Sequence, residues 1–167
     1  FFATTAAGAT GALLPACSPK TPDMTSETEV LHIPATLAGM SIENLRDDYR
    51  ARLFDRYLPF WDKGAFDESI GGVMCNLNDD GTVAEDEKFI WFQGRSLWVY
   101  SYLYNNFGQD QRFLDRAVKL RDFIVKYMDA GDGRWYERMN RDGAVREGVS
   151  KSIFGWAFIA EGLQELF

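Results

Sequence analysis

The spacing of apolar residues predicts four helices and two hairpins. Apolar side chains recur every three or four positions over four stretches, as expected when each helix buries one face. These stretches are 41–60, 86–108, 113–131 and 150–166. Residues 71–83 and 133–145 instead contain short extended runs around an Asp-Gly pair, which is typical of a hairpin turn.

Capping and breaking residues set the expected ends of these helices. Ser41 has the residue type of an N-cap, and Glu43 lies favourably in the first turn. Pro59 is expected to distort or stop the first helix, because proline removes a backbone N–H donor. Asp86 and Gly108 are expected to begin and end the second helix.

The second predicted helix is apolar on nearly all sides, which predicts that it is buried. On a 3.6-residue period Trp91, Arg95 and Trp98 share one face, and Arg95 is the one interior charge. A guanidinium keeps its charge in a protein, so a buried Arg95 must contact a carboxylate, a row of acceptors or a polar ligand. This argument allows both a structural ion pair and a ligand-binding role for Arg95.

Composition indicates a soluble globular protein with the length of one domain. The 167 residues are 46% hydrophobic and 26% charged. The net charge is −7 and no run of Lys and Arg occurs, which argues against nucleic acid or an anionic membrane surface as a partner. Aromatic residues make up 15%, which fits either sugar stacking or packing between large helices.

The N-terminal residues indicate export. Residues 3–16 are small, uncharged and too short to span a bilayer, which is typical of a signal-peptide core. The sequence Leu-Pro-Ala-Cys that ends at Cys17 resembles a bacterial lipobox, with a conventional signal peptidase cut as the alternative. We therefore expect a signal peptide over 1–17, lipidation at Cys17, and a periplasmic or cell-surface protein anchored by lipid in a bacterium. Residues 18–40 contain several Pro, Ser and Thr residues and no sustained apolar period, which predicts a flexible tether.

Both ends suggest that the chain is part of a longer protein. It begins with Phe1 rather than Met, and it stops at Phe167 inside an apolar-periodic helix. We expect residues 41–167 to be the N-terminal part of a larger domain.

The helix and hairpin pattern occurs twice. Gly81 and Gly143 are 62 residues apart, and so are Val83 and Val145. A unit of this kind needs stacked neighbours to bury its inner face. Two such pairs of helices predict an all-α protein that forms the first third of an α/α toroid.

Several motifs resemble one known family. The matching residues are Asp67-Glu68-Ser69-Ile70-Gly71-Gly72, Leu77, Asp80-Gly81, Lys88 and Trp91-Phe92-Gln93-Gly94-Arg95-Ser96-Leu97-Trp98. Through them residues 45–167 resemble the N-acylglucosamine 2-epimerase and cellobiose 2-epimerase family. The resemblance implies an (α/α)6 barrel, of which this chain supplies about two helix pairs with short β-hairpins between helices. Six pairs at a period of 62 need about 370 residues.

The resemblance implies an isomerase that inverts C2 of a reducing-end sugar by removing and returning a proton. Such chemistry needs an acid and a base with pKa values near the working pH, a task suited to histidine. In the family these are histidines on later helices, assisted by a glutamate. The one histidine here, His32, lies in the predicted tether and is interpreted as a linker residue. We therefore expect no catalytic residue in this chain and no activity from it alone. Free hexoses, N-acylhexosamines and disaccharides all stay open as substrates.

The resemblance also implies substrate contacts. Arg95 matches an inner-helix arginine that binds substrate oxygens, and Phe154 falls at or near a family tyrosine, so it keeps a stacking surface but loses a hydroxyl. Trp91 lines the cavity or packs the inner wall, and packing is favoured for Trp98. Gln93 is expected to orient the barrel mouth or the arginine.

No cofactor or metal site is predicted. Asp79 and Asp80 are turn residues, and no cluster of Cys or His supports a metal. Cys75 has no predicted disulfide partner and is interpreted as a small buried side chain.

Two other functions compete with the epimerase. An α/α-toroid glycoside hydrolase or lyase would use a carboxylate pair, with Asp67, Glu68 or Glu161 as one member. A noncatalytic, lipid-anchored sugar-binding protein would keep Arg95 and the aromatic residues without the later histidines. Helix-borne histidines or inward carboxylates beyond residue 167 would discriminate between these functions.

Overall fold

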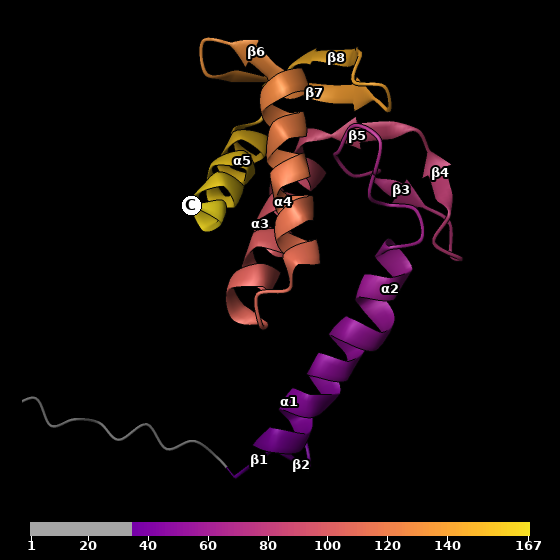
Figure 1. The fold of residues 1–167 in the computed structure, drawn as a ribbon, viewed down its shortest axis with the longest axis vertical. Helices are drawn as coiled ribbons and strands as arrows, with labels where there is room; N and C mark the ends of the chain where they lie inside the picture. Colours follow the sequence, from indigo (N-terminus) through magenta and orange to yellow (C-terminus); the bar gives the residue numbers. More distant parts are fainter. Residues whose placement is uncertain (1–34) are drawn as a thin grey trace, which may run out of the picture. The chain divides into compact units, whose positions relative to one another are not determined.

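The structure is a computed structural model that describes residues 35–167 (Figure 1). The predicted signal peptide, Cys17, His32 and most of the predicted tether lie outside these residues. A small hairpin of β1 (Thr36–Leu37) and β2 (Met40–Ser41) comes directly before the first helix. No helix within residues 35–167 has both the length and the apolar character needed to cross a membrane.

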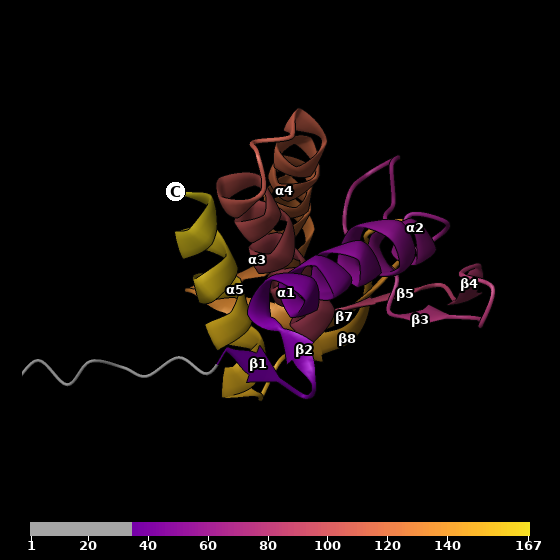
Figure 2. The same ribbon diagram turned by 90° about the horizontal axis from the view of Figure 1, so that it is seen from below.

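Four helical stretches follow one another along the described chain. Their segments are α1 (Ile42–Ala51), η1 (Arg52–Tyr57), α2 (Leu58–Trp61), α3 (Ile90–Asn106), α4 (Gln111–Phe123), η2 (Ile124–Met128) and α5 (Ile153–Leu166). The segments η1 and η2 are π-helical; η1 joins α1 to α2, and η2 extends α4. Figure 2 shows α3 between α4 and α5, and α3 has its most extensive contacts with these two helices.

The strands form a short hairpin and a four-stranded sheet. They are β3 (Asn76–Leu77), β4 (Val83–Glu85), β5 (Glu87–Phe89), β6 (Asp129–Gly131), β7 (Arg134–Asn140) and β8 (Val145–Val149). β3 pairs with β4, and β7 pairs with β5, β6 and β8, all antiparallel. Since β5 precedes α3 and β7 precedes α5, backbone hydrogen bonds join the two repeats.

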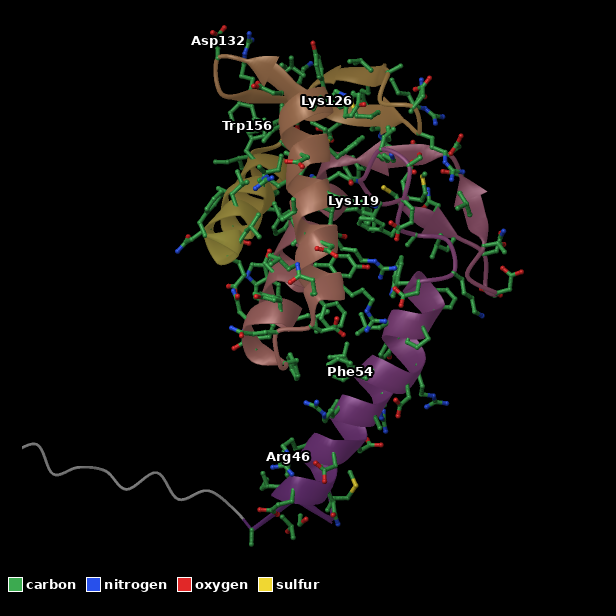
Figure 3. The ribbon with its side chains drawn as sticks, viewed as in Figure 1. Arg46, Phe54, Lys119, Lys126, Asp132 and Trp156 are labelled. Atoms are coloured by element: carbon green, nitrogen blue, oxygen red, sulfur yellow. The ribbon has the colours of Figure 1, made fainter. Side chains whose placement is uncertain are left out.

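The first helix begins where its capping residue predicts. The Ser41 side chain accepts a hydrogen bond from the backbone N–H of Asn44. The predicted distortion near Pro59 is also present, because the π-helical η1 comes immediately before α2. Proline has no N–H and its ring clashes with the preceding turn, which a wider turn relieves. Phe54 of η1 packs edge-to-face on Phe107, with ring centres 5.3 Å apart (Figure 3).

The predicted start of the second helix is wrong. Asp86 is not the N-cap, since α3 begins at Ile90 and Phe89 holds the capping position. Residues Glu87–Phe89 instead form β5, whose register places Glu87 opposite Asn140. Strand pairing uses the backbone groups that a first helical turn would need. The predicted stop is confirmed, because α3 ends two residues before Gly108, which has a φ of +96°.

The later boundaries also shift where strands form. The third helical stretch ends at Met128, and Gly131 lies in β6 rather than at the helix end. The fourth helix begins at Ile153, with Ser152 rather than Ser150 at the capping position. The first shift makes room for β6 and the second for the end of β8, and β7 and β8 are longer than β3 and β4.

Glycines bring α3 and α5 into close contact. A Cβ atom on Gly94 would lie 2.5 Å from the carbonyl carbon of Phe158, and one on Gly162 would lie 2.7 Å from the carbonyl oxygen of Gly94. At Gly155 the added atom would lie 2.8 Å from Ile90. The two backbones therefore approach more closely than side chains at these positions would permit.

The two predicted Asp-Gly turns have the same hydrogen bonds. Gly81 N–H donates to the Asn78 carbonyl at 2.9 Å, and Gly143 N–H donates to the Asn140 carbonyl at 3.0 Å. Both glycines have positive φ, +88° and +86°. Each turn also lies against the end of the preceding helical stretch, because a Cβ on Gly81 would contact Phe60 and one on Gly143 would contact Tyr127. The repeat is therefore present in the structure at the 62-residue spacing.

Candidate functional site

Arg95 is exposed on α3, so the predicted burial of its side chain is not reached within residues 35–167. The helix packs closely on α5 at Gly94, where a Cβ atom would lie 2.5 Å from the Phe158 backbone, and the apolar pattern does not reveal which faces have neighbours. Among residues 35–167, no carboxylate lies within 4.0 Å of its guanidinium nitrogens. The described residues therefore provide no structural ion pair for Arg95.

Arg95 lies against one end of an aromatic cluster. Its guanidinium carbon lies over the Phe158 ring, 4.2 Å from the ring centre. The Trp91 ring centre is 5.9 Å from that of Phe158 and 5.8 Å from that of Phe154. We call Trp91, Arg95, Phe154 and Phe158 the α3–α5 site. The structure thus brings together the three predicted binding residues and adds Phe158.

Sequence reasoning did not identify Phe158 as a site residue. Its position in the apolar period of the fourth helix is equally typical of a core residue. The available signal was its spacing four residues after Phe154, which places both rings on one helix face.

The polar and apolar parts of the site have different exposure. The Phe154 side chain is 59% exposed, so its ring is available for stacking on a ligand. The indole N–H of Trp91 is buried and has no acceptor among the described residues. Trp91 therefore presents carbon atoms rather than its N–H group, and Arg95 is the hydrogen-bond donor of the α3–α5 site.

The face of α3 that carries Arg95 continues toward the C-terminal end of the helix. Trp98 stacks on Tyr102 of the same helix, with ring centres 4.8 Å apart, and each residue is 38% exposed. Trp98 therefore packs on a residue of its own helix, Tyr102, rather than on a neighbouring helix. The expectation that α3 is buried nearly all round is wrong within the described residues.

Gln93 holds the chain before β3 onto α3. Its side-chain oxygen accepts from Val73 N–H and its amide nitrogen donates to the Val73 carbonyl, both at 2.8 Å. The side chain is fully buried. Within residues 35–167 the Gln93 amide bonds to the backbone of Val73 and, at 3.4 Å, to the Phe89 carbonyl, and no hydrogen bond joins it to Arg95.

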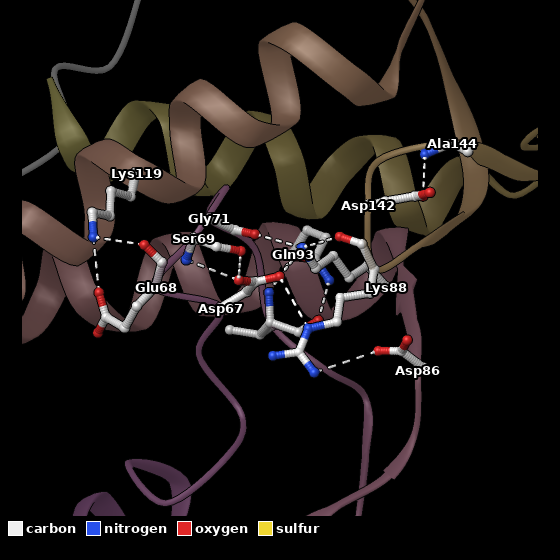
Figure 4. A network of polar contacts seen from close by, with 12 residues as sticks. Asp67, Glu68, Ser69, Gly71, Asp86, Lys88, Gln93, Lys119, Asp142 and Ala144 are labelled. Carbon is white, nitrogen blue, oxygen red and sulfur yellow. Dashed lines mark hydrogen bonds and ion pairs between the residues drawn. The ribbon is translucent and has the colours of Figure 1, made fainter.

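A buried ion pair joins Lys88 of β5 to Asp67 in the loop before β3 (Figure 4). Lys88 Nζ lies 2.8 Å from Asp67 Oδ2, and it also donates to the carbonyls of Gly71 at 2.7 Å and Arg141 at 2.9 Å. Burial alone would raise the pKa of Asp67, but hydrogen bonds from Lys88 and Ser69 outweigh it and lower the pKa from 3.8 to about 2. Asp67 is therefore an ionised structural residue.

The carboxylates considered for a hydrolase are placed unfavourably. Asp67 is occupied by Lys88, and Glu68 pairs with Lys119 of α4 at 2.8 Å. Glu161 is exposed on α5, seven residues after Phe154, which places it on the same helix face. A glycoside hydrolase needs two carboxylates across one bond, and the buried ion pair with Lys88 makes Asp67 unavailable for such a pair.

Cys75 is buried, as predicted, and its sulfur accepts a hydrogen bond from Phe89 N–H at 3.0 Å. Burial raises the pKa of its thiol from 9.0 to about 11, so the thiol is neutral near pH 7. In residues 35–167 no group of three His, Cys, Asp or Glu side chains is arranged to hold a metal ion.

Comparison with known proteins identifies the class. One solved structure, a sugar epimerase from a ruminal bacterium, matches 73% of this chain and 31% of its own chain, with a TM-score of 0.65 and 26% identity. The cellobiose 2-epimerase of Bacillus thermoamylovorans B4167 matches 75% of this chain and 32% of its own, with a TM-score of 0.64 and 24% identity. These proteins are α/α toroids, so the described chain has the fold of part of a sugar-epimerase toroid.

The sequence comparisons identify the family. Residues 71–163 match the family described as N-acylglucosamine 2-epimerase (GlcNAc 2-epimerase), and the chain belongs to this family. It is 32% identical over 124 residues to N-acylglucosamine 2-epimerase of Bos taurus, covering 72% of this chain and 29% of that protein. It is 26% identical over 134 residues to cellobiose 2-epimerase of Dictyoglomus turgidum, covering 77% and 33%. The chain thus spans about a third of the length of these curated relatives.

Proposed function

We propose that this chain is the N-terminal part of a carbohydrate 2-epimerase, which interconverts the C2 epimers of a reducing-end sugar. The observation that carries the proposal is the exposed Arg95 on an aromatic surface, inside the segment that matches the family. Its planar guanidinium has five N–H donors that suit the paired oxygens of a sugar.

The α3–α5 site would bind the sugar rather than perform the proton transfer. Arg95 would donate to sugar oxygens while the exposed Phe154 and the carbon surface of Trp91 cover an apolar C–H face. Opening of the sugar ring exposes a carbonyl at C1, which acidifies the proton on C2. A base on one face and an acid on the other then invert that carbon. Histidines beyond residue 167 would supply both groups, so the 167-residue chain alone is expected to be inactive.

The complete domain in this proposal is an (α/α)6 toroid, with residues 41–167 providing about two helix pairs. Two observations support this proposal. The turns at Gly81 and Gly143 repeat, and the chain spans about a third of the length of its relatives. Reading the complete gene tests this part directly, because two helix-borne histidines with a nearby glutamate should follow residue 167.

We also propose that the protein is exported and anchored by lipid at Cys17, on the bacterial cell surface or in the periplasm. The uncharged run 3–16 and the lipobox-like junction support this location. Metabolic labelling with a fatty acid should mark the wild-type protein and not Cys17→Ala. Label that persists in Cys17→Ala would contradict the proposal.

The binding role of Arg95 is tested by kinetics in the complete protein. Substrates are chosen from those in the names of the relatives: N-acetylglucosamine as an N-acylglucosamine, and cellobiose. Proton exchange at C2 in deuterated water gives the readout. Arg95→Ala should lower kcat/KM about 10- to 100-fold, from the loss of one charge-assisted contact. Arg95→Lys should be almost as impaired, because an ammonium cannot form two parallel hydrogen bonds.

The control is Arg112→Lys, since Arg112 is an exposed arginine at the start of α4 that pairs with Asp110. It should retain wild-type kinetics. Unchanged kcat/KM in both Arg95 variants would contradict the substrate role. Sugar binding without any C2 exchange in the wild-type protein would instead support a noncatalytic sugar-binding protein.

A further inference from the structure

We infer that Phe158 is a positioning residue, which fixes the plane of the Arg95 guanidinium while leaving its N–H groups free for the sugar. This inference rests on the proposed binding role of Arg95. The ring of Phe158 lies under the guanidinium carbon at 4.2 Å, within the range of a cation–π contact. Such a contact uses the face of the guanidinium, whereas all five N–H bonds lie in its plane and point outward at its edges.

Two other arginines of the chain show the contrast. Arg138 lies over the Phe89 ring at 4.7 Å, and its nitrogens also pair with Glu87 at 2.8 Å and Glu147 at 3.0 Å. Arg116 lies over the Phe66 ring at 5.1 Å and pairs with Asp62. In both cases carboxylates occupy guanidinium N–H groups that a ligand would need.

Arg95 has the ring contact without a carboxylate, as does Arg50 over the Phe54 ring at 5.0 Å, but only Arg95 of these two lies in the α3–α5 site. Its distance to the ring centre, 4.2 Å, is shorter than those of Arg138 and Arg116, and among residues 35–167 no acidic group lies within ion-pair distance. An exposed arginine side chain has many rotamers, and immobilising one on binding costs about 0.5–1.5 kcal/mol for a long side chain. A ring that holds the guanidinium beforehand lowers that penalty and leaves the donors available.

The backbone explains how the ring reaches this position. Gly94 precedes Arg95, and a Cβ on it would lie 2.5 Å from the carbonyl carbon and 2.8 Å from the Cβ of Phe158. The absence of a side chain at residue 94 therefore lets the Phe158 backbone lie directly against α3. Trp91 packs against the Phe158 ring with an interplanar angle of 69°, so the ring has a neighbour besides Arg95.

A double-mutant cycle in the complete protein tests this role. Phe158→Leu should raise KM for the sugar about 2- to 5-fold, the range expected for an exposed cation–π contact, with little change in kcat. In an Arg95→Ala background the same substitution should have no further effect, because the group that Phe158 positions is absent. The matched control is Phe92→Leu, an aromatic residue of α3 that packs on Phe89. Its effect should be the same in both backgrounds.

A second measurement avoids any change in packing. Replacing Phe158 with phenylalanines that carry increasing numbers of fluorine atoms keeps the ring shape and weakens its attraction for a cation. KM should rise with fluorination, and Phe158→Tyr should stay near the wild-type value. Equal effects of Phe158→Leu in the two backgrounds, or a KM independent of fluorination, would overturn the positioning role alone. An Arg95→Ala variant with wild-type kinetics would remove the substrate role of Arg95 and the inference together.

Discussion

Lys88 and Asp67 are 21 residues apart, yet Lys88 Nζ lies 2.8 Å from Asp67 Oδ2 and both side chains are almost fully buried. The same ammonium donates to two carbonyls, one before β3 and one in the turn between β7 and β8. Its fourth neighbour is the ring of Phe123 in α4, 4.4 Å from the nitrogen. One buried charge in β5 thus connects the loop before β3, the turn between β7 and β8, and α4.

Removing this charge should strongly destabilise the complete protein. Lys88→Met removes the buried cation of Asp67 and leaves the carboxylate only the more distant, half-exposed Arg141, whose Nε lies 3.6 Å from Asp67 Oδ2. A loss of about 3 kcal/mol of unfolding free energy is expected, at the lower end of the range for breaking a buried pair. Urea titration measures the loss. Lys119→Met is the control, since Lys119 pairs with Glu68 at an exposed position and should contribute less than about 1 kcal/mol. Equal effects of the two variants would contradict a special role for Lys88.

Asp67 should also make stability depend on pH in the acid range. Its folded-state pKa of about 2 is below the ordinary value of 3.8, so the unfolded chain binds a proton more readily. The stabilisation is fully present above about pH 4, and it is lost as the pH falls from there through about 2. Urea midpoints between pH 5 and 2 measure this step. An Asp67→Asn variant that kept the same decrease would show that other groups cause it.

Gly94→Ala should force α3 away from α5. The new methyl group would lie 2.5 Å from backbone of α5, and backbone cannot move aside as a flexible side chain can. Overpacking of this kind costs about 1–3 kcal/mol, which exceeds most of the gain from replacing glycine within a helix. Gly148→Ala is the matched control, because a Cβ there would have no neighbour within 4 Å. A Gly94→Ala variant as stable as Gly148→Ala would contradict the close helix contact.

Gln93→Leu should release the chain before β3 from α3. The substitution leaves the buried Val73 N–H without a partner, at about 1–3 kcal/mol, and leaves the Val73 carbonyl only the weak thiol contact of Cys75 at 4.0 Å. Thermal unfolding measures the change. Gln111→Leu serves as the control, because Gln111 is exposed and bonds only to a side chain of its own helix, Asp115. If the two variants have the same melting temperature, the contact between Gln93 and Val73 contributes little to stability.

Local signals in the sequence predicted the features that depend on neighbouring residues. Ser41 caps its helix because its side chain reaches an N–H three residues away. Gly81 and Gly143 form their turns because glycine readily adopts positive φ. These features require no information about the rest of the fold.

The sequence predictions fail where the structure of a residue depends on segments that are distant in the sequence. Glu87 belongs to a strand because β7, about fifty residues later, pairs with it. The environment of Arg95 depends on which faces of α3 have neighbours, and an apolar pattern shows polarity but not partners. Phe158 escaped notice for the same reason, since an aromatic residue in a helical period is equally consistent with a core position and with support for a cation.

The twin turns provide an internal reference for local motion. Asp80 accepts a hydrogen bond from Thr82 N–H and Asp142 accepts one from Ala144 N–H, both at 2.9 Å. Amide hydrogen exchange at Thr82 and Ala144 therefore reports the opening of the same bonded loop in two surroundings. Once each rate is divided by the intrinsic rate of its own sequence, the difference between the two protection factors measures what the adjoining helix ends and strands add, without reference to another protein.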